Sequence, residues 1–182
     1  MDLSLIDLPT EVVRTERLVL RPYRPDDVEA VHRACQDPDI QRWLKVPSPY
    51  TEADAAQFVT ETTVQARAEG QALLTAVEAD GEFVGSAGFH LSRGPLGPGV
   101  GYWIAPWARG HGYAAEAAHA LAEWGLGLGA HRVHLLADVG NAASQAAAVR
   151  AGFTREGVLR SCLDYRDGSR GDGVIFSRLP ED

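Results

Sequence analysis

The sequence predicts a single α/β domain in which one mixed central sheet of about seven strands is flanked by about four helices. Two observations lead to this fold class. Two helical segments come before the first hairpin, and extended and helical patterns then alternate to the end of the chain. One strand–helix–strand unit, over residues 101–138, requires a parallel pair of strands. A single such unit cannot make a doubly wound sheet, so the sheet is mixed.

The N-terminal half supplies the two early helices. Residues 1–14 read as a loose lead-in, and residues 18–21 as a short strand. Acidic side chains at the start of residues 26–36 suit the positive end of a helix, and apolar residues recur there at helical spacing. Three prolines break regular structure in residues 37–50. A Thr with an Asp three residues later marks the start of the second helix, residues 51–69, which a glycine ends.

The C-terminal half supplies most of the sheet. An Asp-Gly pair at residues 80–81 predicts a tight hairpin turn, because both central positions of that turn need positive φ. After the hairpin come a strand, an amphipathic helix, a buried strand, a short helix and a final hairpin. These elements are expected at residues 73–79, 83–90, 101–104, 112–128, 131–138, 141–150, 154–164 and 172–179.

Composition excludes several classes of protein. The 182 residues fit one domain, residues 1–182 with a core at about 12–179. A content of 45% hydrophobic and 23% charged residues is ordinary for a globular chain and excludes a disordered one. The net charge of −8 argues against direct nucleic-acid binding, which needs a basic surface. It favours a cationic substrate weakly, although acidity for solubility alone is an alternative.

The cysteines and the hydropathy give no signal for a metal site, a disulfide or a membrane span. Cys35 and Cys162 lie far apart, outside C-x-x-C spacing, and the histidines form no ligand pattern. The first residues are acidic where a signal peptide is basic, and no apolar run reaches about 18 residues. We therefore expect a cytoplasmic protein with no metal and no membrane segment.

The chemical motif is the segment from Pro106 to Ala115, which joins a strand to a helix. Gly110 and Gly112 let the backbone pass close to a ligand, and free amides at the helix start favour an anion. This geometry suits a pyrophosphate, and a merely tight turn is the alternative. The glycine spacing also fits a dinucleotide fingerprint, with Asp138 as the ribose acid. That fingerprint belongs near the start of a repeated βαβ array, whereas about 100 residues precede it here.

The same segment resembles the acyl-CoA loop of the GNAT superfamily of N-acetyltransferases. The pattern of that family is Gln/Arg-x-x-Gly-x-Gly/Ala, and residues 109–114 match it at every specified position. Asn141, with the Gly-Phe pair at 152–153, is similar to the family's segment after its fifth strand. The stretch at 15–21 and the Gly-Tyr-Trp-Ile strand at 101–104 resemble the Rim-type subgroup, the ribosomal-protein N-acetyltransferases and their relatives.

The resemblance implies that acetyl-CoA, the co-substrate, binds where two parallel strands splay apart, here residues 100–104 and 132–138. Unpaired main-chain groups near Ile104 are expected to bond the pantetheine arm and the oxyanion. Asn141 matches a position that bonds the same arm, and a helix N-cap is an equally good role for it. The residues expected to bind the cofactor are Ile104, Arg109, Gly110, His111, Gly112, Tyr113, Ala114 and Asn141.

The resemblance also implies direct attack by a neutral amine on the thioester, which needs a base for the ammonium and a proton for the thiolate. Ala148 stands where many family members have a Tyr as the acid, and Ser144 matches a serine of Rim-type enzymes. Gly99 stands where many have a Glu as the base, and Asp164 resembles an acid on the sixth strand of Rim-type enzymes. A surface role is the alternative for Ser144 and for Asp164.

The acceptor site is expected to involve Trp43, Tyr50 and His90. The two aromatic residues lie in the segment that walls the acceptor site in the family, where rings can cover an amine. Packing under a loop is the alternative. His90, with Glu78, is a fallback base, and a structural role is its alternative. The Rim-type resemblance implies a protein N-terminal α-amine as the acceptor, and the family's habit suggests a homodimer. A small amine, such as an antibiotic or polyamine, and a CoA-binding regulatory module without turnover remain alternatives.

Overall fold

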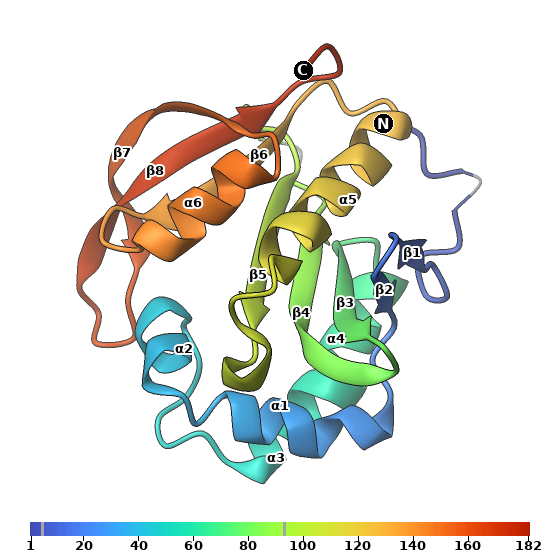
Figure 1. Cartoon of the computed structure of the whole chain (residues 1–182), viewed down its shortest axis with the longest axis vertical. Helices are drawn as coiled ribbons and strands as arrows, with labels where there is room; N and C mark the ends of the chain where they lie inside the picture. The colour runs from blue at the N-terminus through green and yellow to red at the C-terminus, as the bar shows by residue number, and fades with distance from the viewer. Residues whose placement is uncertain (5, 93) are drawn as a thin grey trace.

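The computed structural model describes residues 1–4, 6–92 and 94–182, and in them one eight-stranded sheet lies between two layers of helices (Figure 1). The strand order is β1-β2-β3-β4-β5-β6-β8-β7. Only β5 and β6 are parallel neighbours among these strands. The strands are β1 (Val13–Arg14), β2 (Leu18–Arg21), β3 (Ala72–Ala79), β4 (Glu82–His90), β5 (Gly99–Ile104), β6 (Val133–Asp138), β7 (Thr154–Asp164) and β8 (Arg170–Arg178).

The mixed α/β fold expected from the sequence is confirmed, with one strand more than expected. The additional strand is the two-residue β1, which lies in the lead-in and pairs with β2. The helical segments are η1 (Pro25–Asp27), α1 (Val28–Ala34), α2 (Pro38–Trp43), α3 (Glu52–Gln57), η2 (Phe58–Thr62), α4 (Thr63–Ala68), η3 (Pro106–Ala108), α5 (Tyr113–Gly127) and α6 (Ala142–Arg150).

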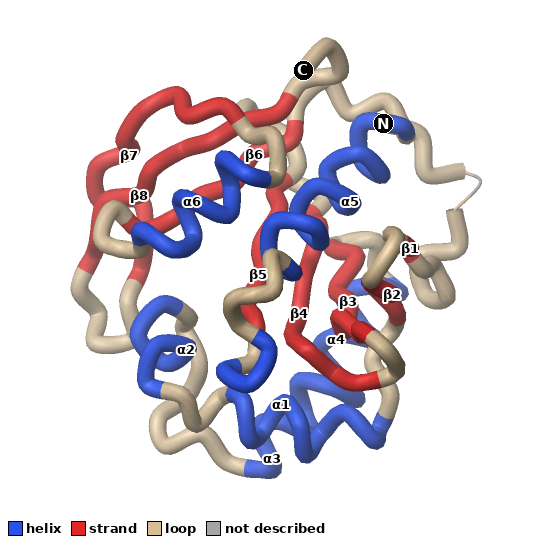
Figure 2. The backbone as a smooth tube through the Cα atoms, viewed as in Figure 1, coloured by secondary structure: helices blue, strands red, loops and turns tan. Residues whose placement is uncertain are grey.

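Two hydrophobic cores lie on opposite faces of the sheet, beneath the helices that Figure 2 shows in blue. One core joins the sheet to α5 and α6, and Leu121 and Ala148 are fully buried in it. The other joins it to α1, α2 and α3, through residues such as Val31, Ile40 and Ala55. The cofactor motif precedes α5, whereas the segment expected to wall the acceptor site contains α2. The two layers thus separate the two expected binding regions.

The helix α2 corrects the expectation that residues 37–50 lack regular structure. A carboxylate oxygen of Asp37 accepts the N–H of Ile40 at 3.0 Å and caps the helix. Pro38 occupies the first turn, where its missing N–H removes no helical hydrogen bond. Pro38 therefore lies in the first turn of the helix, whereas Pro47 and Pro49 lie in the irregular segment that follows Trp43.

The remaining local expectations of the N-terminal half are confirmed. The helix predicted at residues 51–69 begins with a capping box between Thr51 and Asp54, and Gly70 follows it at φ 66°. A π-helical turn, η2, interrupts this helix between α3 and α4. The hairpin turn at Asp80 and Gly81 has φ of 50° and 83°, as a turn with two positive φ values requires.

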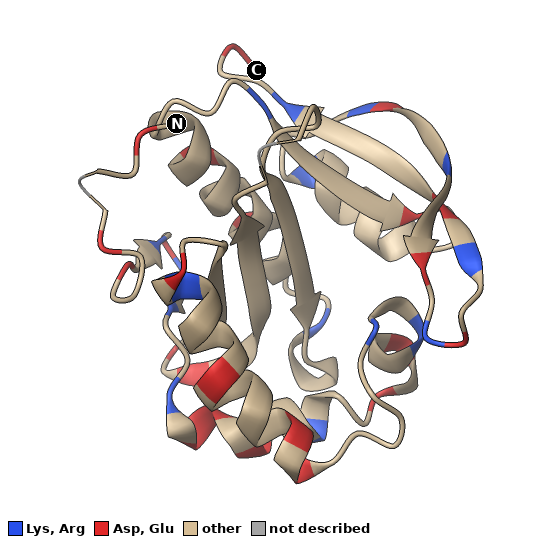
Figure 3. Ribbon diagram, turned by 180° about the vertical axis from the view of Figure 1, so that it is seen from behind, with Lys and Arg blue, Asp and Glu red and all other residues tan. Residues whose placement is uncertain are grey.

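Acidic residues gather on the helical layer of α1, α3 and α4, which is seen from behind in Figure 3. Glu29, Glu52, Glu61 and Glu69 are exposed on or beside these helices. Much of the chain's negative charge therefore lies on the face away from α5 and α6. These carboxylates therefore do not repel an anionic ligand at the cofactor motif at short range.

Candidate active site

The parallel strands β5 and β6 diverge from a single point of contact. They share one paired position, Gly99 with His134, and the N–H of His134 donates to the carbonyl of Pro98 at 2.9 Å. From there β5 continues along β4 as far as Ile104, and β6 continues along β8 as far as Asp138. Figure 1 shows the widening gap between the two strands. Their facing edges have backbone groups that are free to bond a ligand.

A cavity of about 940 Å³ fills this gap and crosses the sheet from face to face. Alternate residues of a strand point to opposite faces. Leu135 and Ala137 of β6 belong to the core beneath α5 and α6, so Leu136 and Asp138 point the other way. All four residues line the cavity. The cavity therefore has one mouth on the α5 and α6 side and another on the α2 side.

The backbone from Arg109 to Ala114 lies along the first mouth. Gly110 and Gly112 have φ of 84° and 81°, and Gly112 is the N-cap of α5. The N–H of Glu116 bonds the carbonyl of Gly112 at 3.1 Å and begins the helical ladder. Within the described residues, no backbone acceptor is recorded for the amides of residues 109–112, and those of the first turn of α5 have no partner in their own helix. These amides, at the positive end of the helix, fit a pyrophosphate.

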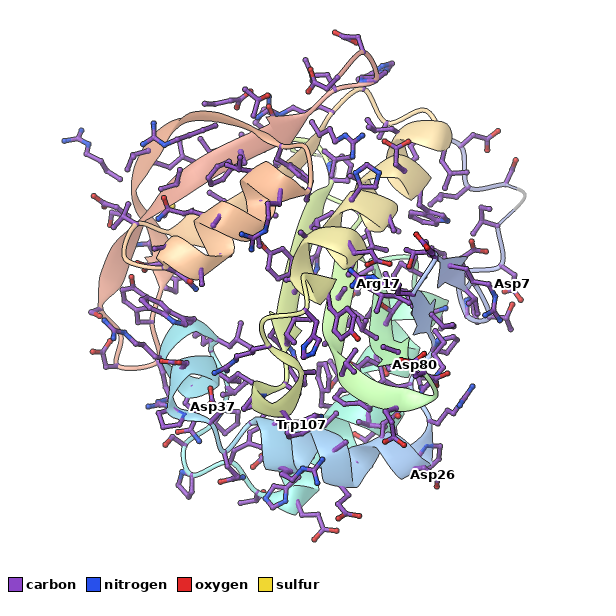
Figure 4. The ribbon with its side chains drawn as sticks, viewed as in Figure 1. Asp7, Arg17, Asp26, Asp37, Asp80 and Trp107 are labelled. Atoms are coloured by element: carbon purple, nitrogen blue, oxygen red, sulfur yellow. The ribbon has the colours of Figure 1, made fainter. Side chains whose placement is uncertain are left out.

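Arg17 holds this loop from the side of β2 (Figure 4). Its guanidinium donates to the carbonyl of His111 at 3.1 Å and forms an ion pair with Glu116 of α5. It also lies 5.2 Å from the ring centroid of Tyr113. The His111 ring stacks on the same tyrosine ring, with 5.4 Å between the two centroids. The carbonyl of the loop is thus tied back, which leaves its amides directed to the cavity. The sequence analysis missed Arg17, because its partners are about 100 residues away.

Arg109 contributes its backbone to the loop, whereas its side chain anchors α2. The guanidinium forms an ion pair with Asp37, the residue that caps α2, at 2.5 Å, and a longer one with Asp39 at 3.5 Å. Figure 4 shows Asp37 at the start of α2. Burial alone would raise the pKa of Asp37, but the bonds from Arg109 and the Ile40 amide hold it below its usual value. Arg109 therefore links the expected cofactor side to the expected acceptor side.

Ser144 and Asn141 both line the cavity at the start of α6. The side-chain oxygen of Asn141 accepts the N–H of Ser144 at 3.0 Å, so the N-cap role is observed. The hydroxyl of Tyr102 donates to the carbonyl of Ser144 at 3.0 Å and lies 3.3 Å from its Oγ. Burial raises the pKa of Tyr102. Tyr102 belongs to the Gly-Tyr-Trp-Ile strand, but nothing in the sequence showed that it reaches Ser144.

One cation of the cavity wall has no carboxylate partner. Arg109 is paired with Asp37, whereas Arg150, at the end of α6, takes part in no ion pair recorded among the described residues. An anionic ligand in the cavity is attracted to such a free guanidinium. Arg150 is thus a further candidate for binding phosphate, and the sequence analysis did not single it out.

Asp164 and Trp43 also line the cavity, whereas Tyr50 and His90 do not. Asp164 forms an ion pair with Arg170 at 2.6 Å, and 57% of its side chain is exposed. Tyr50 is buried in the core beneath α1 and α3, so its ring packs under the loop.

His90 lies at the end of β4 that is remote from Ile104. It pairs with Gly99, and Ile104 is five residues further along the antiparallel neighbour, about 16 Å away. Burial, together with the nearby His134, lowers the pKa of His90. The structure therefore places Tyr50 and His90 away from the central cavity, which Trp43 lines.

Within the residues that the structure describes, no group of three His, Cys, Asp or Glu side chains is arranged to hold a metal ion. No helix in this part of the chain combines the length and apolar character needed to cross a membrane.

Residues 17–154, well over half of the chain, match the family described as acetyltransferase (GNAT) domain. The chain belongs to the GNAT family. Its members include "Putative ribosomal N-acetyltransferase YdaF" of Bacillus subtilis, which is 30% identical over 90% of this chain and 92% of that protein. This agrees with the Rim-type resemblance, and the chain is an N-acetyltransferase of this family.

Solved structures of GNAT members have the same fold. A "putative ribosomal-protein-serine acetyltransferase" from Vibrio cholerae is 26% identical, with a TM-score of 0.78 over 94% of this chain and 99% of that chain. The microcin C7 self-immunity acetyltransferase MccE, in complex with acetyl-CoA and AMP, has a TM-score of 0.79 over 91% of this chain and 93% of that chain. MccE is 21% identical, so its likeness concerns the fold alone.

Proposed function

We propose that this GNAT enzyme acetylates a protein N-terminal α-amine, by direct attack of the amine on acetyl-CoA in a ternary complex. The observation that carries the proposal is the cavity that crosses the sheet between β5 and β6. Its first mouth has the amide loop that fits a pyrophosphate, and its second mouth lies beside α2. Two substrates that enter from opposite faces meet in the gap, which lowers the barrier by orientation alone.

The second mouth supports a polypeptide acceptor. A further cavity of about 470 Å³ shares part of its wall with the first and extends it along the surface. The shared residues are Trp43, Leu44, Asp138, Asp164 and Tyr165. Such a continuous groove gives the residues after an N-terminus a place to lie, and a single small amine does not need it. The names of YdaF and of the Vibrio cholerae protein refer to ribosomal acceptors, which agrees with a polypeptide acceptor here.

The residues of the first mouth are proposed to bind the cofactor as follows. Amides of residues 109–114 hold the pyrophosphate, the backbone near Ile104 bonds the pantetheine arm and the oxyanion, and Asn141 reaches the same arm while it caps α6. Arg150 adds a cation for phosphate. The Ser144 hydroxyl, supported by Tyr102, delivers a proton to the departing thiolate. Asp164 lines the second mouth as a candidate base.

The test measures the release of free CoA thiol with a panel of N-terminal peptides, polyamines and aminoglycosides. We expect turnover with peptides to exceed turnover with small amines. Gly112→Trp is expected to abolish CoA binding, because an indole at this N-cap fills the loop. Preference for a small amine would contradict the polypeptide acceptor. Tight acetyl-CoA binding with no thiol release for any amine would favour a regulatory module.

A further inference from the structure

We propose that the carboxylate of Asp138, held between Trp43 and Tyr165, binds the acceptor's ammonium group and takes its proton. This inference rests on the proposed function, because it assigns a residue of the acceptor mouth to the same reaction. Asp138 is the last residue of β6 and lines both the central cavity and its surface extension. The sequence analysis considered it only as a ribose-binding acid.

The strand geometry points this carboxylate to the acceptor side. Ala137 is buried beneath α6, so the next side chain along β6 lies on the opposite face. On that face are α2, which carries Trp43, and the β7–β8 turn, which carries Tyr165. Ser144 and the amide loop are on the other face. Asp138 therefore faces the incoming amine across the gap from the expected cofactor.

The carboxylate is oriented but has capacity left. One oxygen accepts the N–H of Gly140 at 2.7 Å, and the other accepts the hydroxyl of Tyr165. Its own carbonyl is fixed by the N–H of Asn141 at 2.9 Å and by the side chain of Gln145 at 3.0 Å. An ionised carboxylate offers about four acceptor directions, so roughly two remain for an ammonium.

Two aromatic rings confine this position. A Cβ placed on Gly140 would lie 3.5 Å from the Trp43 ring and 3.2 Å from a carboxylate oxygen of Asp138, so ring and carboxylate adjoin the same glycine. The Tyr165 ring packs on Gly171, where a Cβ would collide with it. Arg42 lies 4.5 Å from the Trp43 ring centroid and shows that this ring already accepts a cation. Aromatic faces beside a carboxylate are suited to an ammonium ion.

Asp138 differs from Asp164 in charge balance. Asp164 is neutralised by Arg170 and more than half exposed, whereas Asp138 is half-buried and joins no ion pair recorded among the described residues. Arg42, Lys45 and Arg166 line only the surface extension, whereas Arg109, which is paired with Asp37, and Arg150 line the central cavity. The other charged residues of that extension are Arg42, Lys45, Asp164, Arg166 and Asp167. Among the described carboxylates that line the central cavity, Asp138 is therefore the one with no recorded ion pair.

The proposed step balances as follows. Asp138 takes one proton from the acceptor ammonium, and the nitrogen's freed electron pair forms the C–N bond to the thioester carbonyl carbon. The C–S bond breaks with its electron pair on sulfur, and the second nitrogen proton passes to that sulfur through Ser144. The products are the N-acetyl amide and the free thiol, and Asp138 releases its proton to solvent.

The test compares Asp138→Asn with Asp164→Asn, on a peptide that the wild-type enzyme acetylates. Asn keeps the acceptor for Gly140 but removes the charge. We expect Asp138→Asn to lower kcat/KM for the peptide about 100-fold, as loss of a general base does. The Kd for CoA should stay within about twofold, because the residue faces the other mouth. A larger loss in Asp164→Asn, or a loss below about threefold in Asp138→Asn, would overturn the assignment.

A pH profile separates a base from a merely structural residue. Without a base, only the amine that is already neutral reacts, so kcat/KM of Asp138→Asn should rise with pH up to the pKa of an α-amine, about 8. The wild-type profile should level off at lower pH, and parallel profiles would count against the proposal. Tyr165→Phe, which keeps the ring, should raise the peptide KM about fivefold with an unchanged CoA Kd, even if Asp138→Asn fails to fold. An inactive wild-type enzyme would instead refute the proposed function.

Discussion

Gly110 and Gly168 have the same backbone conformation in two distant turns, with φ of 84° and 83°, and a Cβ at either would meet no atom within 4 Å. Alanine at either position therefore costs only backbone strain, about 1–2 kcal/mol. We expect equal losses of Tm in Gly110→Ala and Gly168→Ala. Only Gly110→Ala should weaken CoA binding, about tenfold by calorimetry, because its amide loop is distorted. Equal CoA affinity in the two variants would remove the loop from the binding site.

Ser144 and Tyr102 are in contact at the start of α6. The proposed proton donor is the Ser144 hydroxyl, and Tyr102 bonds the same residue. We expect Ser144→Ala to lower kcat at least tenfold with an unchanged CoA Kd, because only the protonation of the thiolate is lost. Tyr102→Phe should lower kcat less. Steady-state kinetics that showed the reverse order would assign the acid to the tyrosine.

At the scale of elements, most of the fold was predictable from local pattern. The hairpin at Asp80 and Gly81 and the helix that Thr51 caps follow from residues within one turn of one another. α2 was missed, because three prolines in a short segment indicate irregular structure unless the cap at Asp37 is recognised. β1 was missed, because two residues carry no periodicity and are defined only by their partner strand.

The candidate site was predictable to the extent that it is continuous in the chain. The loop that follows Arg109 and the cap at Asn141 were found from spacing. The contacts of Arg17 with that loop and of Tyr165 with Asp138 join residues separated by 94 and 27 positions. No short-range pattern reports such contacts. The position of His90, away from the central cavity, was not foreseeable for the same reason, since it depends on the register of β4 with β5.

An ion pair joins Arg132, which precedes β6, to β7 at the far end of the sheet. Arg132 donates to Glu156 of β7 at 2.7 Å, and Ser177 of β8 donates to it at 2.7 Å. The bond from Arg132 and the bond from Ser177 lower the pKa of Glu156 to about 2. Because the folded pKa lies below the unfolded value of 4.5, this stabilisation is complete above pH 4.5 and is lost as pH falls toward 2.

The expected effect of Glu156→Gln is a shallower fall of the unfolding free energy between pH 4.5 and 2. At neutral pH the loss should be about 1 kcal/mol or less, because the side chain is 38% exposed and solvent screens the pair. Urea unfolding at a series of pH values measures both quantities. Arg132→Gln should make the fall of the unfolding free energy at acid pH shallower in the same way. If this fall is as steep in Glu156→Gln as in the wild type, Glu156 is not its cause.

For the whole molecule, the sheet consists of two parts joined at one position. β1 to β5 form one part, and β6, β8 and β7 the other, with Gly99 and His134 as the only paired residues between them in the described chain. α5 crosses from one part to the other over one face, and the ion pair of Arg109 with Asp37 ties the loop to α2 on the other. The gap proposed to bind the substrates is thus also the gap that separates the two parts.

CoA binding should therefore stabilise the whole fold, since its arm takes the place of the missing inter-strand bonds. A ligand at 100 times its Kd stabilises the folded state by about 2.7 kcal/mol. For a chain of this size we expect a rise in Tm of about 5–10 °C by scanning fluorimetry. Amide exchange should slow in residues 100–104 and 135–138 but not in β1. At the same CoA concentration Gly110→Ala should show a smaller rise than Gly168→Ala, because it binds CoA less tightly. A rise in Tm without slower exchange in these strands would place the coenzyme elsewhere.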